Sequence, residues 1–155
     1  MKKAASVLST AASNAGEEWL PNRILIPSIK LDAIAVRGVG EESLKKGPGR
    51  DPDSALPGHS GNCVIAAHRN AYGWWFYNLN ELPSGAHIEL RTPCGSYIYA
   101  LTSTRVLPET ATWALNPPQD PNAVPRLTLY TCALPHGSHR IVVTAKLART
   151  EAPAD

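Results

Sequence analysis

The sequence predicts one mostly β domain with one or two short helices. The chain has 155 residues, which is the size of one ordinary domain. Apolar residues make up 43% of it and charged residues 18%, as in a globular protein. The 14 prolines and 11 glycines divide the apolar residues into short runs that are rich in β-forming types, so we expect short strands joined by turns.

The charge balance argues against two classes of partner. Lysine and arginine total 15, aspartate and glutamate total 13, and the formal net charge is +2. So small a charge, without a long basic run, does not favour nucleic acid or an acidic membrane surface. No apolar run approaches the roughly 18 to 20 residues of a membrane helix, so we expect this chain to be soluble.

The two ends of the chain are expected to lie outside the folded domain. Residues 1–22 carry two lysines followed by small residues. They can bury little apolar surface, so we expect a flexible leader or a cloning remnant. Residues 149–155 are expected to be a flexible tail. The folded domain then spans residues 23–148.

The first half of the domain contains short apolar runs. Residues 23–29 and 34–36 are predicted strands, limited by Pro27 and Asp32. Residues 41–45 predict a helical turn, which the following Gly-Pro-Gly ends. The continuous run at 63–67, Cys-Val-Ile-Ala-Ala, predicts a strand that is covered on both faces.

An aromatic segment and a hairpin follow. Residues 72–82 hold four aromatic side chains in a row, and their spacing predicts a short helix that covers the core. Residues 86–91 and 97–106 read as two strands of a hairpin. Gly95 lies in the turn between them, where it can supply a positive φ.

The last two strands are separated from the hairpin by a long loop. Residues 126–132 and 140–147 are dense in β-forming side chains and predict strands. Residues 113–125 form a proline-rich loop, of the kind that often flanks a binding groove.

Three of the predicted strand ends carry reactive side chains. Cys132 ends one strand, His68 follows another, and Arg140 begins the last. If these strands are neighbours, the three side chains meet at one rim. A thiolate could then attack a carbonyl, an imidazole could move the proton, and a guanidinium could stabilise the oxyanion. This chemistry requires no metal and no cofactor.

These residues resemble the motifs of sortases. The segment Leu-Thr-Leu-Tyr-Thr-Cys at 127–132 is similar to the family's T-L-x-T-C, with Tyr130 at the free position. The segment Ala-Ala-His-Arg at 66–69 resembles A-G-H-R and departs from it at Ala67. Arg140 falls where sortases carry their arginine, and the order along the chain agrees. The resemblance covers residues 25–147.

The resemblance implies a closed sortase-type β-barrel and a cysteine transpeptidase. Such an enzyme cleaves an LPxTG-like signal through a cysteine thioester and transfers the acyl group to an amine. The implied roles are nucleophile, general acid and base, and oxyanion contact for Cys132, His68 and Arg140. Thr131 would shape the backbone, the Ala133 amide would add an oxyanion donor, and Trp113 would contact the peptide.

The resemblance also implies partners and a location. The substrates would be proteins with a C-terminal sorting signal, and the acceptor an amine of peptidoglycan or of another surface protein. We expect a monomer at the extracytoplasmic face of a bacterial envelope, with a membrane anchor in the full-length form. The sequence shows no Asp-Pro-aromatic lid, so a pilin-polymerising type is not expected.

Two alternatives remain open at this point. Cys132, His136 and His139, with His68 or Cys63, could hold zinc in a binding module. A sortase-like barrel could also bind a peptide without turnover. The other two cysteines have structural interpretations, Cys63 in the core and Cys94 in an exposed turn, and a disulfide between them would need close Cα atoms.

Overall fold

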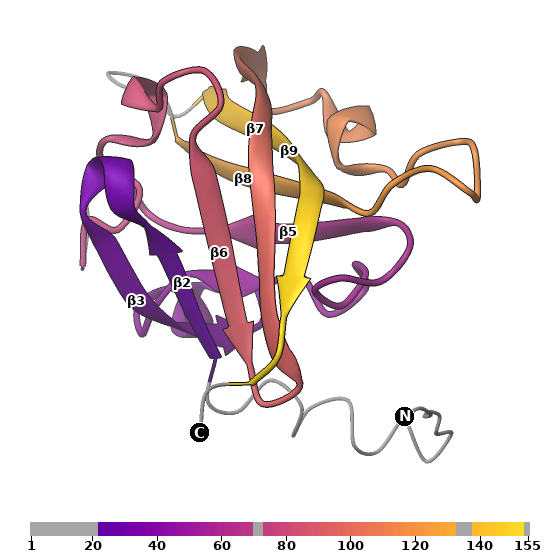
Figure 1. Cartoon of the computed structure of the whole chain (residues 1–155). Helices are drawn as coiled ribbons and strands as arrows, with labels where there is room; N and C mark the ends of the chain where they lie inside the picture. Colours follow the sequence, from indigo (N-terminus) through magenta and orange to yellow (C-terminus); the bar gives the residue numbers. More distant parts are fainter. Residues whose placement is uncertain (1–21, 70–72, 133–137, 154–155) are drawn as a thin grey trace.

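Eight strands close into a barrel in this computed structural model (Figure 1). The structure describes residues 22–69, 73–132 and 138–153. Around the barrel the strands follow the order β2, β3, β4, β5, β8, β9, β7, β6. The prediction of a mostly β closed barrel is therefore confirmed.

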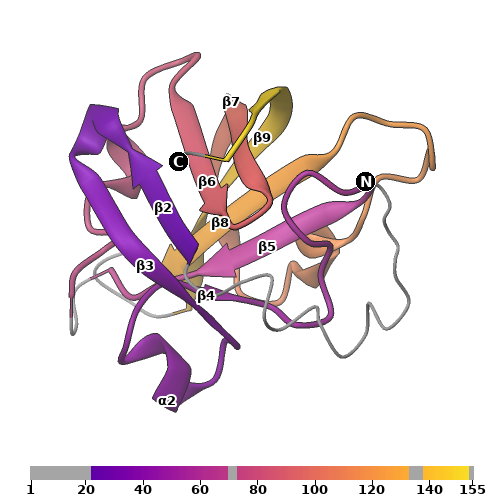
Figure 2. The same cartoon turned by 60° about the horizontal axis from the view of Figure 1, so that its bottom comes forward.

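The strands vary widely in length. They are β2 (Asn22–Ile26), β3 (Leu31–Arg37), β4 (Gly49–Arg50), β5 (Asn62–Ala66), β6 (His87–Thr92), β7 (Gly95–Pro108), β8 (Arg126–Cys132) and β9 (His139–Glu151). In the described part of the chain the helical elements are α2 (Glu41–Leu44) and three 3-10 turns, η2 (Pro27–Ile29), η3 (Leu79–Glu81) and η4 (Thr112–Leu115). The predicted turn at 41–45 is thus confirmed as α2, which lies outside the barrel wall (Figure 2).

The hairpin of β6 and β7 also matches the prediction. Thr92 pairs with Gly95, and the Gly95 φ of 138° lies in the region that glycine favours. Strand β5 is buried along its whole length, as its continuous apolar run predicts.

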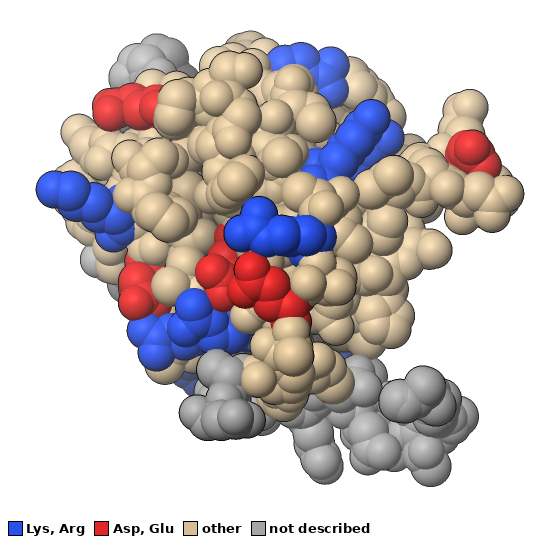
Figure 3. All heavy atoms as spheres, viewed as in Figure 1, with Lys and Arg blue, Asp and Glu red and all other residues tan. Residues whose placement is uncertain are grey.

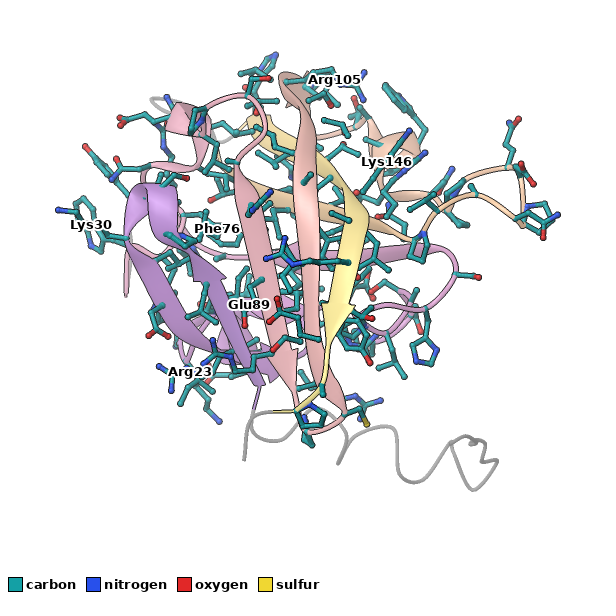
Figure 4. All side chains as sticks on the ribbon, viewed as in Figure 1. Arg23, Lys30, Phe76, Glu89, Arg105 and Lys146 are labelled. Carbon is teal, nitrogen blue, oxygen red and sulfur yellow. The ribbon has the colours of Figure 1, made fainter. Side chains whose placement is uncertain are left out.

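The predicted helix at 72–82 is wrong for the residues that the structure describes. Residues 73–82 form turns and the single 3-10 turn η3. Trp74 has a φ of 55°, a left-handed conformation that an α-helix cannot contain. The segment still covers the core, because Phe76, which Figure 4 labels, and Leu79 are fully buried.

Three predicted strands have different bounds. The first strand ends at Ile26, where Pro27 begins η2. The second begins at Leu31 and is longer than predicted, because Asp32 does not interrupt it. Asp32 lies on the outer face, where its carboxylate accepts a hydrogen bond of 2.7 Å from the Arg23 guanidinium of the neighbouring strand. The last runs to Glu151, which pairs with Ser96, so residues 149–151 belong to β9 and not to a flexible tail.

The barrel interior is filled by one apolar cluster. Its largest fully buried members include Tyr99, Phe76, Ile24, Ile26, Ile65, Leu127 and Leu129. Cationic and anionic side chains are interspersed on the face that Figure 3 shows, in keeping with the net charge of +2. No helix among the described residues has the length and apolar character to cross a membrane.

We expect Phe76→Ala to lower the free energy of unfolding by about 3–5 kcal/mol, because it removes a buried ring from a packed core. Chemical denaturation followed by circular dichroism measures this change. Tyr77→Ala is the matched control, since its ring is 41% exposed, and it should cost less than about 1 kcal/mol. Equal losses in the two variants would contradict the assignment of Phe76 to the core.

Candidate active site

Strand β5 ends two residues before His68, and its neighbour β8 ends at Cys132. The two strands are parallel neighbours, and Ala66 pairs with Tyr130. The ladder continues one step beyond β5, because the Ala67 N–H donates to the Tyr130 carbonyl at 3.3 Å. Residue 68 would lie opposite residue 132 if this register continued by two more pairs.

Strands β8 and β9 bring Arg140 to the other side of Cys132. These strands are antiparallel, and Cys132 and Arg140 are direct partners in the register. Adjacent strands lie about 4.7–4.9 Å apart, so on the extended register positions 68, 132 and 140 would form a short row across the sheet. We call His68, Cys132 and Arg140 the strand-end row.

The strand-end row occupies one face of the sheet. Odd-numbered residues of β5, β8 and β9 face the core, namely Cys63, Ile65, Leu127, Leu129, Ile141, Val143 and Ala145. Side chains alternate along a strand, so the even-numbered positions lie on the outer face. Positions 132 and 140 share that parity, and residue 68 has the same parity on the extended register of β5. The pleat of the sheet therefore puts the core residues on one face and the positions of the strand-end row on the other.

The guanidinium of Arg140 rests on an aromatic ring. Its Cζ lies 4.8 Å from the ring centroid of Tyr130, which belongs to the same outer face. Both side chains are half-buried. This contact places the positive charge over the Tyr130 ring, on the strand that ends at Cys132.

The end of β5 is held by the segment that follows it. The Phe76 N–H donates to the carbonyl of His68 at 3.2 Å. The Arg69 guanidinium donates to the Tyr77 carbonyl at 3.1 Å. His68 itself is half-buried, and the Nε2 atom of its imidazole is buried.

A polar contact ties the long loop over the same face. The Asn62 amide donates to the carbonyls of Leu115 and Asn116 at 3.1 and 3.2 Å. Its carbonyl accepts the buried Thr128 hydroxyl at 2.8 Å. A cavity of about 520 Å³ lies between this part of the loop and residues 51–64. This cavity lies beside the beginning of β5, and His68 follows the other end of that strand.

A family model described as the sortase domain matches residues 24–148. The chain belongs to the sortase family. The family was predicted from the motifs, and this prediction is confirmed.

Known sortases are similar to the chain in sequence and in fold. Sortase A from Streptococcus agalactiae is 27% identical over 134 residues, which are 82% of this chain and 52% of that protein. Sortase D from Bacillus subtilis is 29% identical over 82 residues, or 53% of this chain and 40% of that protein. The chain thus spans about half of these relatives or less.

Solved sortase structures superpose over most of the chain. Sortase E from Streptomyces avermitilis has a TM-score of 0.76 at 29% identity and covers 85% of this chain and 90% of that one. A Sortase D5 transpeptidase from Clostridium perfringens has a TM-score of 0.75 at 28% identity, with 83% and 79% covered. The barrel is therefore the sortase barrel.

The other predicted residues of the sortase site lie in different places. Thr131 faces the core and is 3% exposed, and its hydroxyl has no hydrogen-bond partner among the described residues. Ala133 lies outside the described residues. Trp113 lies in η4, is 56% exposed and stacks with Arg105 at 5.4 Å. It lines a second cavity, of about 540 Å³, with Pro117, Pro118 and Arg126.

Two side chains of the site were not found from the sequence. Tyr130 stood at the free position of the motif, and Asn62 followed a glycine without an assigned role. The one indication of a role for Asn62 was that it is a polar residue at the beginning of a buried strand. The contact of Tyr130 with Arg140 depends on the register of two strands, which the sequence does not display.

The two remaining cysteines have the predicted environments. Cys63 is buried in the core, Cys94 is exposed in the hairpin turn, and both thiols are free. Burial raises the pKa of the Cys63 thiol to about 12. Among the described residues no group of three metal-binding side chains occurs, while His136 of the zinc alternative lies outside them.

We expect Cys94 to be alkylated by iodoacetamide at pH 8 within minutes, and Cys63 to react only after unfolding. The reagent requires a thiolate, and with a pKa of about 12 about one Cys63 thiol in ten thousand would be ionised at that pH. Peptide mapping by mass spectrometry before and after denaturation measures both. Rapid labelling of Cys63 in the folded protein would contradict its assignment to the core.

Proposed function

We propose that the chain is a cysteine transpeptidase that cleaves an LPxTG-like sorting signal and transfers the acyl group to an amine. The strand-end row supports this proposal, because Cys132 and Arg140 are register partners and the pairing of β5 with β8 ends two residues before His68 and Cys132. Membership of a family of cysteine transpeptidases supports it.

In the first step the Cys132 thiolate attacks the carbonyl carbon of the residue that precedes the scissile bond. A carbon–sulfur bond forms, and the carbonyl oxygen takes the negative charge. Arg140 donates hydrogen bonds to this oxyanion, which favours the tetrahedral intermediate. When the intermediate collapses, the carbon–nitrogen bond breaks and His68 gives its proton to the leaving amine.

In the second step an acceptor amine attacks the thioester. A carbon–nitrogen bond forms, the carbon–sulfur bond breaks, and the thiolate is released. His68 takes the proton that the amine loses and returns to its starting state. Atoms and charges balance over the cycle, and no cofactor is required.

We infer the remaining roles from the same mechanism. The Ala133 amide would supply a second oxyanion donor, Thr131 would hold the backbone beside the nucleophile, and Trp113 would contact the peptide. The substrates would be proteins with a C-terminal signal at the outer face of the cell envelope. Residues 23–148 would constitute the catalytic domain, acting as a monomer.

We expect Cys132→Ala to abolish peptide cleavage, because no other side chain can form the thioester. Mass spectrometry of a pentapeptide library built on LPxTG, with hydroxylamine or an amine acceptor, measures cleavage after the fourth residue. Cys94→Ser is the matched control and should retain wild-type activity, since Cys94 lies in the distant hairpin turn. Turnover by Cys132→Ala would overturn the proposed function.

We expect Arg140→Ala to lower kcat/KM by about 10²- to 10³-fold, or about 2.7–4 kcal/mol, the usual effect of removing one oxyanion donor. The same peptide assay, run at several peptide concentrations, measures it. Arg149→Ala removes an exposed arginine from the far end of β9, where it pairs with Glu151, and should change the rate less than about twofold. A similar rate for Arg140→Ala and the wild type would remove Arg140 from the mechanism.

A further inference from the structure

Tyr130 and Arg140 are diagonal neighbours on the outer face of β8 and β9. Tyr130 pairs with Val142, and Cys132 pairs with Arg140, so the ring lies one pair along the ladder from the arginine. The arginine bends back over the ring, and its Cζ lies 4.8 Å from the ring centroid. This distance is within the range of a cation–π contact.

The strand that carries the ring is held by a neighbouring strand on each side. Tyr130 belongs to a central strand of the barrel, between Ala66 of β5 and Val142 of β9. These two neighbours are only 2% and 3% exposed. Tyr130 therefore offers Arg140 a fixed surface, whereas the arginine side chain alone is long and flexible.

The kind of contact matters for the chemistry. Among the described residues, other arginines and a lysine form ion pairs with carboxylates, as Arg23 does with Asp32, whereas Arg140 forms none. A carboxylate would occupy the N–H donors of a guanidinium and neutralise its charge. A ring face attracts the cation and leaves the N–H donors, which lie in the guanidinium plane, available to a substrate.

We propose that Tyr130 is a positioning residue that holds the Arg140 guanidinium in place beside Cys132 for the oxyanion. The inference rests on the proposed transpeptidase function, and it gives a role to the free position of the T-L-x-T-C motif. It requires the aromatic face of Tyr130 and not its hydroxyl.

The kinetic test compares Tyr130→Phe with Tyr130→Leu in the peptide assay. Tyr130→Phe keeps the ring and should stay within about twofold of the wild type. Tyr130→Leu should lower kcat by about 3- to 30-fold with little change in KM, the range that corresponds to a cation–π contact of ordinary strength. In an Arg140→Ala background the same leucine substitution should have no further effect on kcat.

Tyr77→Leu is the matched control, because Tyr77 also carries an arginine over its ring, Arg69 at 5.8 Å, but lies on an exposed turn. It should leave kcat unchanged. If Tyr130→Leu raised KM and left kcat unchanged, Tyr130 would be a contact for the peptide and not a positioning residue. If Tyr130→Phe lost as much activity as Tyr130→Leu, the hydroxyl would be required and the inference would be wrong.

A second measurement does not depend on turnover. The ring current of Tyr130 should shift the side-chain proton resonances of Arg140 upfield in the NMR spectrum of the folded protein. The shift should persist in Tyr130→Phe and disappear in Tyr130→Leu. An inactive wild type that shows this shift would contradict the proposed function and uphold the contact, whereas an active wild type without the shift would overturn the inference alone.

Discussion

The parallel pairing of β5 with β8 is the constraint on which the site depends. Its backbone hydrogen bonds fix Ala66 opposite Tyr130, two residues before His68 and Cys132 respectively. The antiparallel pairing of β8 with β9 then fixes Arg140. Parallel strands require a long connection, and here residues 67–125 supply it. That connection includes the hairpin of β6 and β7 and the loop that borders the cavity. The parallel pairing therefore accounts for both the strand-end row and the segments around it.

The pleat of these strands lets one short segment serve two purposes. In β8, Leu127 and Leu129 fill the barrel, whereas Thr128 and Tyr130 face outward. The outward side is not left to solvent, because Thr128 bonds to Asn62 and Tyr130 supports Arg140. The packed core on one face thereby fixes the backbone that carries the proposed catalytic residues.

The sequence predicted the strands of the site well, since residues 126–132 carry a dense β pattern and end at the cysteine. It also predicted the barrel and the family, because residues 66–69 and 127–132 resemble the motifs of a family whose fold is known. Other features depend on long-range pairing or on unusual backbone and could not be predicted. Residues 149–151 become strand only by pairing with β7, and the left-handed Trp74 ends a helical pattern. The Tyr130 contact follows from register, which local sequence does not specify.

A designed disulfide tests whether positions 68 and 132 are neighbours in the folded protein. In a Cys94→Ser background, His68→Cys should form an intrachain disulfide with Cys132 under mild oxidation, because neighbouring strand positions lie within the Cα separation that a disulfide spans. Intact mass and peptide mapping would show the loss of two hydrogen atoms and the linked peptides. His59→Cys in the same background is the control and should remain unlinked. Failure of His68→Cys to link to Cys132 in the folded protein would contradict the adjacency of these two positions and the strand-end row that depends on it.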